Sequence, residues 1–308
     1  MTRHGVAVIG TGYIGAVHIE QLMRIPQVRV IGIADADPGT ARGVAERFAI
    51  PKVYSDAAEA IADREVQVIH NCTPSNAHFE INRMAIEAGK EVLSEKPLAL
   101  TSGESAELVR LSKEHGTVTG INFCCRYYPV VQEAAVRAAR GDIGEVYCLA
   151  GTFFQDWLLY ETDYSWRLDP AMAGSSNIIG DLGSHWCDLA QFMTGLKITE
   201  VMAELRTVLP VRKCPKNKAA LTFCSSADTE YEDVEVSMDE YGAMLLRFEN
   251  GATGTFTTCQ LAAGRKADIE IQVYGSKGSL AWSQQRSSEL WLGHRDQPNQ
   301  TLIESPIL

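Results

Sequence analysis

The chain has 308 residues, of which 45% are hydrophobic and 22% are charged, and this composition is typical of a globular protein with a substantial core. Its formal net charge of −11 argues against non-specific binding to nucleic acids or anionic membranes, because their phosphates would repel it. At about 150 residues per domain, the length predicts two domains.

The N-terminal segment and the cysteines bear on the location of the protein and on its metal content. The opening segment, MTRHGVAVIG, lacks the long apolar stretch of a secretory signal, and no apolar run approaches the ~18 residues of a membrane helix. The eight cysteines are scattered without a C-x-x-C pair, which indicates reduced thiols in a cytoplasmic protein. Because no ligand cluster with zinc spacing stands out, we expect no bound metal.

The first part of the chain alternates short apolar runs with segments of helical periodicity. Strands are expected at residues 5–10, 28–35, 66–72, 91–95 and 117–122. Helices are expected at residues 13–25, 38–48, 75–88 and 102–115. Repeated strand–helix–strand units of this length predict a parallel sheet wrapped by helices, an α/β domain of the doubly wound Rossmann type over residues 1–124.

The pattern changes after Phe123. Helices are expected at 130–140 and at about 177–194. Longer alternating segments predict strands at residues 146–154, 200–208, 243–250, 252–261, 267–275 and 278–282. These elements predict an α+β domain over 125–308, built on a large open, mostly antiparallel sheet. The polar segment 209–237 has no clear periodicity, and we interpret it as a long loop, either a lid or an oligomer contact.

Residues 10–15, GTGYIG, match the G-x-G-x-x-G pattern between a predicted strand and a predicted helix, as the motif requires. Gly10 permits a tight turn, Gly12 lets the backbone approach a pyrophosphate, and Gly15 lets the helix pack on the strand. The N–H groups at the start of the helix, around Tyr13 and Ile14, would then bind the phosphates. A glycine turn without a ligand is the alternative.

Asp35 ends the second predicted strand, where a carboxylate accepts hydrogen bonds from a ribose diol in dinucleotide-binding domains. Asp37 is close by, and two acids would repel a 2′-phosphate, so the sequence favours NAD over NADP. Arg42 could accommodate NADP by moving in, which keeps NADP as the alternative.

A second candidate stretch on the cofactor side is Asn71-Cys72-Thr73-Pro74, which closes a predicted strand. Strand ends of such sheets face the ligand crevice, so Thr73 and Pro74 would line the nicotinamide ribose. His78, one helical turn on, would join them. An ordinary surface or cap-region histidine explains His78 equally well.

GDLGSHWCDLAQF, residues 180–192, is the other informative stretch. Asp181 and His185 are four residues apart and share one face of a helix, and Asp188 lies three further along the same stripe. A histidine beside a carboxylate is the usual proton-transfer pair near neutral pH. A surface i,i+4 pair explains the spacing equally well, and metal binding by the pair is not expected because no further ligands cluster there.

Together, several stretches resemble, in order and spacing, motifs of the glucose–fructose oxidoreductase / inositol dehydrogenase (Gfo/Idh/MocA) family. They are GTGYIG, Asp35, NCTPSNAH (71–78), SEKPLAL (94–100) and GDLGSHWCDL (180–189), and the resemblance covers essentially the whole chain. It implies a Rossmann domain followed by an α/β domain whose open sheet is often a dimer or tetramer surface.

The resemblance also implies roles for the residues of these motifs. Lys96 is the active-site lysine beside the nicotinamide and the substrate oxygen, and Pro97 follows it, often through a cis peptide bond. Glu95 belongs to the cofactor side, where it either pairs with Lys96 or braces the loop. His185 is the general acid/base, and Asp181 hydrogen-bonds a substrate hydroxyl and helps to set the charge on His185.

Other matching residues point to the substrate. Arg126 and Tyr127, in NFCCRYYP, match a family stretch on the substrate side. The segment 156–170 is rich in aromatic and acidic groups, which suit sugar rings and hydroxyls, so we expect five of its residues at the pocket or its rim: Trp157, Tyr160, Tyr164, Trp166 and Arg167. Packing against the open sheet is the alternative for each.

The expected activity is NAD(P)-dependent hydride transfer between nicotinamide and a secondary alcohol or ketone carbon of a sugar, sugar derivative or cyclic polyol. The alternatives are an NAD-dependent glycosidase that oxidises its substrate transiently and a non-catalytic nucleotide-binding sensor. We expect a homodimer or homotetramer that binds no nucleic acid and no membrane. Family chains usually continue through a closing helical tail beyond the segment that ends at Leu308, so this chain is expected to be shortened or to lack that tail.

Overall fold

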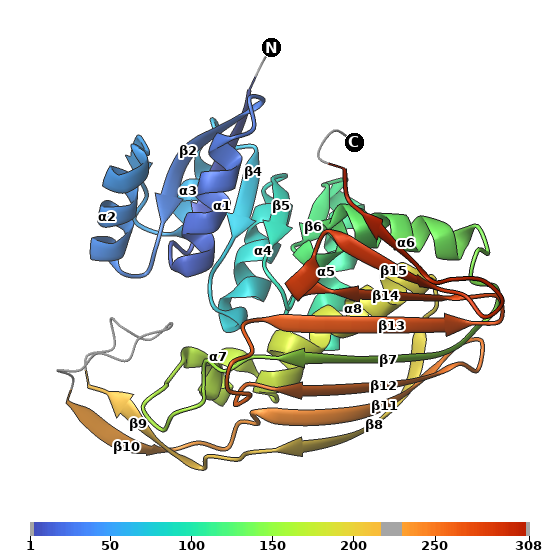
Figure 1. Ribbon diagram of the computed structural model, residues 1–308. Coiled ribbons are helices and arrows are strands. Elements are labelled where there is room, and N and C mark those ends of the chain that lie inside the picture. The colour runs from blue at the N-terminus through green and yellow to red at the C-terminus, as the bar shows by residue number, and fades with distance from the viewer. Residues whose placement is uncertain (1–2, 217–229, 306–308) are drawn as a thin grey trace. The chain divides into compact units, whose positions relative to one another are not determined.

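This computed structural model describes residues 3–216 and 230–305 of the chain (Figure 1). The chain divides into two compact units, of which the first extends to Asn122 and includes Ala171–Ser175, and the second comprises Phe123–Pro170 and the residues from Ser176 onward. The predicted domain boundary, between residues 124 and 125, lies next to Asn122. Among the described residues, no helix combines the length and the apolar character needed to cross a membrane.

The first unit is a six-stranded parallel sheet of order β3-β2-β1-β4-β5-β6. Its strands are β1 (His4–Ile9), β2 (Val28–Ala34), β3 (Lys52–Val53), β4 (Val68–Asn71), β5 (Glu91–Ser94) and β6 (Thr119–Ile121). Its helices are α1 (Tyr13–Met23), α2 (Pro38–Phe48), α3 (Ala57–Ala62), α4 (His78–Glu87) and α5 (Ser102–His115). This strand order is that of the doubly wound dinucleotide-binding fold, so the predicted Rossmann domain is confirmed. The short elements β3 and α3 are absent from the prediction because so few residues give no periodic signal.

Local chemistry explains where these elements begin and end. The central strand β1 buries Val6 to Ile9 on both faces, which is why its sequence is an uninterrupted apolar run. Helix α2 begins after Asp37, whose carboxylate accepts hydrogen bonds from two backbone N–H groups of the first turn. Helix α5 begins with a reciprocal capping box between Thr101 and Glu104.

The carboxyl ends of the three central strands are level with one another. Ile9 of β1 pairs in register with Asn71 of β4, and Asn71 pairs in register with Ser94 of β5. The residues that follow these strands, including the glycine loop and Glu95, therefore emerge at one edge of the sheet. In parallel α/β sheets this edge is where ligands bind.

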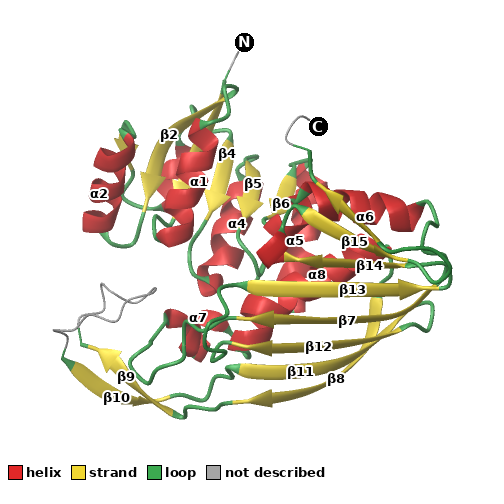
Figure 2. Cartoon of the chain, in the orientation of Figure 1, coloured by secondary structure: helices red, strands yellow, loops and turns green. Residues whose placement is uncertain are grey.

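The second unit contains an eight-stranded mixed sheet of order β16-β15-β14-β13-β7-β12-β11-β8 (Figure 2). Its strands are β7 (Val146–Phe154), β8 (Ile198–Arg206), β11 (Tyr241–Phe248), β12 (Thr253–Cys259), β13 (Asp268–Gly275), β14 (Ser279–Ser283), β15 (Glu289–Gly293) and β16 (Gln300–Ile303). Every pairing is antiparallel except that of β7 with β12. The predicted large, mostly antiparallel sheet is therefore confirmed. Strands β15 and β16 extend it beyond the predicted elements.

Helices α6 (Pro129–Ala139) and α8 (Ser184–Thr194) pack against this sheet and against each other (Figure 2). Trp186 of α8 is completely buried, stacks on Phe256 with ring centroids 4.8 Å apart, and donates a hydrogen bond from Nε1 to the carbonyl of Glu270 at 3.0 Å. Gly151 of β7 leaves room for this indole, since a Cβ there would lie 2.1 Å from Trp186 Nε1. These contacts fix the helix that carries His185 against the sheet.

The segment 209–237 is not the patternless loop that its sequence suggests. Its described parts form a two-stranded antiparallel ribbon of β9 (Val211–Pro215) and β10 (Tyr231–Glu235). Exposed ion pairs such as Lys213–Asp233, 3.1 Å apart, link the two strands. These charged residues interrupt the alternation of polar and apolar residues by which a strand is predicted from sequence. Residues 217–229 lie outside the described part, and the lid interpretation for them is not tested.

Candidate active site

The glycine loop joins β1 to α1 in the first unit. Gly10 has a φ of +84°, and a Cβ there would lie 2.6 Å from the carbonyl oxygen of Cys72. A Cβ at Gly15 would lie 2.0 Å from the carbonyl oxygen of Gly10, whereas a Cβ at Gly12 would meet nothing within 4 Å. Packing therefore requires two of the glycines, and the open space beside the third suits a ligand that lies close to the backbone.

The start of α1 is suited to oxygen ligands. Its N-cap is Gly12, and no side chain caps the helix, so its first N–H groups are not satisfied by a capping side chain. The side chain of Tyr13 is largely exposed, whereas that of Ile14 packs partly against the core between β1, β2 and the helices.

Asp35 follows β2 and braces the glycine loop. Its Oδ2 accepts hydrogen bonds from the backbone N of Thr11 at 2.6 Å and from Thr11 Oγ1 at 2.9 Å, and its Oδ1 accepts one from the backbone N of Asp37 at 3.0 Å. Asp37 itself caps α2, and the hydrogen bonds from the side chain and backbone of Thr40 lower the pKa of its carboxyl group. Both acids are therefore tied to backbone at the position expected for a ribose-binding carboxylate.

His78 is the first residue of α4, so it lies in the cap region, which is one of the alternatives that the sequence left open. It is buried, with 1% of its surface exposed, so it is not a surface histidine. Its Nδ1 lies 2.6 Å from the carbonyl oxygen of Pro97, and its Nε2 lies 2.8 Å from that of Thr73. Because both ring nitrogens face backbone oxygens, His78 supports the loops at the ligand edge. Burial lowers its pKa, although the two carbonyls act in the opposite direction.

Thr73 and Pro74 remain half-buried at the ligand edge after β4. The hydroxyl of Thr73 donates a hydrogen bond to Asn71 Oδ1 at 2.7 Å, and the amide of Asn71 donates to Asn82 Oδ1 at 2.9 Å. Thr73 is therefore fixed by the asparagine that ends β4, two residues earlier in the chain.

Lys96 lies in the turn that follows β5, at the same edge of the sheet as the glycine loop. It is half-buried, and the expected cis bond between Lys96 and Pro97 is confirmed. Glu95 is buried: its Oε1 lies 3.0 Å from His18 Nε2 and 2.6 Å from Asn122 Nδ2, and its Oε2 accepts the backbone N–H of Lys96 at 3.3 Å. Glu95 thus braces the turn that carries Lys96.

Burial raises the pKa of the Glu95 carboxyl group, but the hydrogen bonds from His18 and Asn122 outweigh burial, so the pKa is lowered overall and Glu95 is ionised. His18 and Asn122 are absent from the predicted site. The available signal was weak: His18 falls on the inward stripe of α1 with Gly15, Ile19 and Leu22, where a polar side chain needs a buried partner.

In the second unit, a π-helical turn, Ile179–Gly183, leads directly into α8 and carries Asp181. Asp181 is buried, so the alternative of a simple surface pair with His185 is wrong. Its Oδ1 accepts a hydrogen bond from Arg167 Nε at 3.1 Å, and its Oδ2 accepts one from Gln260 Nε2 at 3.1 Å. Gln260 is a further residue that the sequence did not single out.

His185 lies in the first turn of α8 among aromatic rings. Phe123 and Phe153 approach it edge-on, with ring centroids 5.8 Å and 6.1 Å away, and Cys125 Sγ is 4.0 Å from its Nδ1. These neighbours limit the orientations of the imidazole while leaving it half-buried. Such an arrangement suits a group that exchanges protons with a ligand.

The structure brings several of the predicted substrate residues together around Arg167. Its guanidinium carbon lies 4.4 Å from the ring centroid of Trp166 and 5.1 Å from that of Trp157, while Asp181 holds its Nε. We call this set (Trp157, Trp166, Arg167 and Asp181) the indole–arginine cluster. Tyr160 is largely exposed and Tyr164 is half-buried, and neither side chain belongs to this cluster.

Arg126 is engaged by α8. Its Nε donates to Asp188 Oδ2 at 2.6 Å, its Nη2 donates to Asp188 Oδ1, and its guanidinium lies 5.2 Å from the centroid of Phe192. Asp188, which shares the predicted stripe of His185, therefore binds an arginine. Tyr127 is 73% exposed. Neither contact of Arg126 reaches the indole–arginine cluster.

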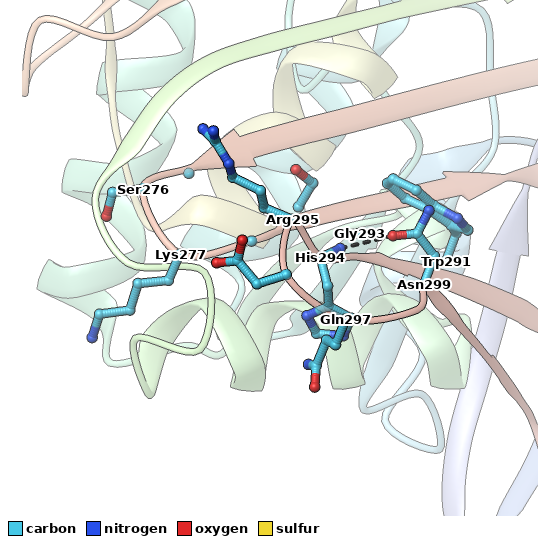
Figure 3. A pocket seen from close by; sticks show the side chains of 12 residues that line it. Ser276, Lys277, Trp291, Gly293, His294, Arg295, Gln297 and Asn299 are labelled. Atoms are coloured by element: carbon cyan, nitrogen blue, oxygen red, sulfur yellow. Dashed lines mark hydrogen bonds between the residues drawn. The ribbon is translucent and has the colours of Figure 1, made fainter.

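A separate open hollow lies at the hairpin end of the second sheet, between the turn after β13 and the turn after β15 (Figure 3). Its lining includes Lys277, Trp291, His294 and Arg295, and none of the predicted site residues belongs to it.

Two family models match most of the chain. Residues 4–123 match the oxidoreductase family with an NAD-binding Rossmann fold, and residues 131–281 match the GFO/IDH/MocA C-terminal domain. The chain belongs to the GFO/IDH/MocA oxidoreductase family. The family resemblance predicted from the motifs is therefore confirmed, and the first unit of this GFO/IDH/MocA protein is an NAD-binding domain.

Among the relatives of this GFO/IDH/MocA protein is levoglucosan dehydrogenase of Pseudarthrobacter phenanthrenivorans, 32% identical over 301 residues that cover 94% of this chain and 76% of the relative. Myo-inositol 2-dehydrogenase of Thermotoga maritima is 26% identical over 275 residues, covering 89% of this chain and 74% of the relative. A solved structure of levoglucosan dehydrogenase in complex with NADH and L-sorbose has a TM-score of 0.89 and 30% identity, covering 100% of this chain and 81% of that one.

Proposed function

We propose that this oxidoreductase transfers a hydride reversibly between NAD and a secondary alcohol carbon of a sugar, sugar derivative or cyclic polyol. The observation that carries the proposal is the half-buried Lys96, held at the ligand edge of an NAD-binding sheet by a buried, ionised Glu95. A lysine there has the charge and hydrogen-bonding capacity to stabilise an oxygen that becomes negative as hydride leaves its carbon. The relatives named for levoglucosan and myo-inositol support a polyhydroxylated substrate.

The residues of the glycine loop fit a dinucleotide. Gly10 and Gly15 allow the tight β1–α1 turn, the space beside Gly12 is open, and the start of α1 would hold the phosphates. Asp35 would accept a hydrogen bond from a ribose hydroxyl and repel a 2′-phosphate, so we propose NAD rather than NADP. When bound, the nicotinamide supplies the hydride acceptor or donor.

The remaining chemistry falls to side chains of this chain. We propose that His185 removes the hydroxyl proton of the substrate during oxidation and returns it during reduction, since an imidazole titrates near neutral pH. Lys96 stabilises the developing alkoxide. Asp181, which accepts hydrogen bonds from Arg167 and Gln260, would also accept one from a substrate hydroxyl.

We propose that the indole–arginine cluster contributes to sugar recognition. Indole faces provide apolar surface for the C–H face of a sugar ring, and the cation beside them provides hydrogen-bond donors for its hydroxyls. Trp157 and Trp166 both lie against the Arg167 guanidinium, so the three side chains are held in one place before any ligand binds. Arg126 and Tyr127 remain predicted substrate residues.

We also propose that two or more copies associate through the open sheet in the cytoplasm. The edge strand β8 and its neighbour β11 expose a group of large hydrophobic side chains: Val201, Met202, Leu205 and Leu245. Exposed apolar patches of this kind mark association surfaces. Sedimentation analysis of the wild type and of Met202→Lys tests this proposal, which predicts a smaller species for the variant and fails if both are monomers.

The proposed activity is tested by following NADH fluorescence with a panel of aldoses, inositols, anhydrosugars and glycosides. Lys96→Ala and His185→Ala variants should bind NAD with a dissociation constant within about threefold of wild type while losing at least ~10²-fold in kcat. Near-normal turnover in either variant would refute its assigned role. Net hydrolysis of a glycoside without NADH accumulation would indicate the glycosidase instead, and tight NAD binding without any turnover would indicate the sensor.

A further inference from the structure

A buried chain of polar side chains runs beneath the turn that carries Lys96. Four neighbouring segments of the first unit contribute one member each: His18 from α1, His70 from β4, Glu95 after β5 and Asn122 after β6. The two histidines and the glutamate are each less than 9% exposed. Burying three ionisable groups together is costly unless they neutralise and hydrogen-bond one another, so this chain calls for a physical explanation.

The order of donors and acceptors along the chain follows from its chemistry. An ionised Glu95 carboxylate can only accept, so His18 Nε2 donates to it across 3.0 Å. The other ring nitrogen, His18 Nδ1, lies 3.0 Å from Nδ1 of His70, with the rings edge-on at 85°. Burial and, to a smaller extent, the charge of His18 lower the pKa of His70 to about 4, so His70 is neutral near pH 7 and can donate or accept. His18 thus has a fixed donor side and an adaptable side.

Lys96 is held on its other side as well. The carbonyl of Pro97, the residue that follows Lys96, faces Nδ1 of the buried His78 at 2.6 Å. Glu95, the residue that precedes Lys96, is tied to His18. The two residues that flank Lys96 are therefore each anchored to a different buried histidine.

We propose that His18, acting through Glu95, is a positioning residue that holds the turn carrying Lys96 in the place where the amine can meet the substrate oxygen. This inference rests on the proposed function, because it takes Lys96 to be the group beside the reacting oxygen. In this arrangement His18 holds the carboxylate in place and ionised, and the carboxylate fixes the backbone N–H of Lys96.

The charged and titratable neighbours are consistent with this role. Glu95 faces His18 from α1 and His70 and Cys72 from the β4 side, and it interacts electrostatically with Lys96. The charge of Lys96 helps to lower the pKa of Glu95, so the two side chains attract each other. His78 is the other titratable group that interacts with Lys96, and its low pKa keeps it from adding a second positive charge near neutral pH.

A matched pair of substitutions separates the two sides of His18. In His18→Gln the amide nitrogen can replace Nε2 and still donate to Glu95, whereas in His18→Asn the shorter side chain replaces Nδ1 and loses Glu95. We expect His18→Asn to lower kcat by roughly 10- to 100-fold with the KM for NAD changed less than about threefold, and His18→Gln to retain most of the wild-type kcat. His115→Gln, at the exposed end of α5, is the control and should match wild type. Equal kcat in the Gln and Asn variants, whether both low or both normal, would overturn the proposal.

A second measurement does not depend on turnover. Pyridoxal 5′-phosphate forms a Schiff base with an accessible amine, and borohydride reduction followed by peptide mass spectrometry quantifies that adduct at Lys96 at one fixed pH. We expect the labelled fraction to change at least about twofold in His18→Asn and in Glu95→Gln, and to stay unchanged in His18→Gln. Unchanged labelled fractions in both of the first two variants would overturn the proposal.

The two readouts keep this inference separate from the proposed function. If the wild type oxidises no polyol but the labelled fractions change as expected, the proposed reaction is wrong and the positioning by His18 stands. If the wild type is active and the labelled fractions do not change, the reverse holds. Near-UV circular dichroism confirms the fold of each variant, and Glu95→Gln decides the outcome if His18→Asn does not fold.

Discussion

Arg212 offers the sharpest test of how the aromatic segment of the second unit is held. This residue of β9 is completely buried and pairs with the equally buried Glu240, with Nη2 to Oε1 at 2.7 Å. Its guanidinium also donates to three backbone carbonyls of one loop, those of Leu158, Tyr160 and Asp163, at 2.9 to 3.0 Å. One side chain thus fastens the ribbon to the loop that lies between Trp157 and Trp166.

Replacing Arg212 by Met leaves Glu240 as a buried carboxylate without its cation. Its Oε2 still accepts a hydrogen bond from the backbone N–H of Val208 at 2.7 Å. Breaking a buried ion pair in this way costs about 3–5 kcal/mol, and at ~2–4 °C per kcal/mol the melting temperature should fall by roughly 10 °C. We also expect the KM for the sugar to rise, because the loop beside Trp157 loses its anchor, while the dissociation constant for NAD stays unchanged.

Thermal unfolding and urea titration measure the first effect, and steady-state kinetics measure the second. The double variant Arg212→Met/Glu240→Gln removes the stranded charge and should recover at least half of the lost stability. Lys213→Met, next along β9 but in an exposed pair with Asp233, is the control and should cost less than about 1 kcal/mol. A single variant that melts within ~2 °C of wild type, or a double variant no more stable than the single one, would refute the reasoning.

Two further predictions concern the first unit. Gly12→Ala should change the free energy of unfolding by less than about 1 kcal/mol, yet weaken NAD binding at least tenfold. Gly15→Ala should destabilise the fold itself, because its Cβ would lie 2.0 Å from the Gly10 carbonyl oxygen. Equal unfolding curves for the two variants would contradict this prediction. Because the pKa of His70 is lowered from 6.5 to about 4 in the folded state, the unfolded chain binds its proton first, and stability should fall by up to ~3 kcal/mol as the pH drops from about 6.5 to 4. Urea titrations at pH 7, 6, 5 and 4 should show a shallower decline in His70→Gln, and an identical decline would contradict the assignment.

Local patterns were sufficient to predict most of the fold. Uninterrupted apolar runs such as Val6–Ile9 predict buried parallel strands, and alternation predicts the long strands of the second sheet. The β9–β10 ribbon could not be predicted, because its strands are short and charged and because its buried arginine resembles a surface residue in sequence. A fully buried charge is recognised only when its partners are known.

The same distinction applies to the candidate site. Residues carried by short motifs, such as Gly10 and Lys96, could be singled out because the motif lies within one strand–turn–helix unit. His18, Asn122 and Gln260 could not, because each acts through a partner on another element, 77, 27 and 79 residues away along the chain. No periodicity encodes such pairs. For His78 the sequence left a cofactor contact and a surface or cap-region position open, and the structure shows a buried residue at the start of α4.

The placement of β7 has a consequence for the order in which this protein can be assembled. This strand lies in the middle of the second sheet, yet both of its neighbours, β12 and β13, come from much later in the chain; the hydrogen bond from Thr258 to the carbonyl of Phe153 spans 105 residues. During synthesis, β7 therefore leaves the ribosome long before either neighbour exists. The Rossmann sheet, whose strands are all complete by Ile121, can form first, and the helix bearing His185 gains its supporting sheet only near the end of translation.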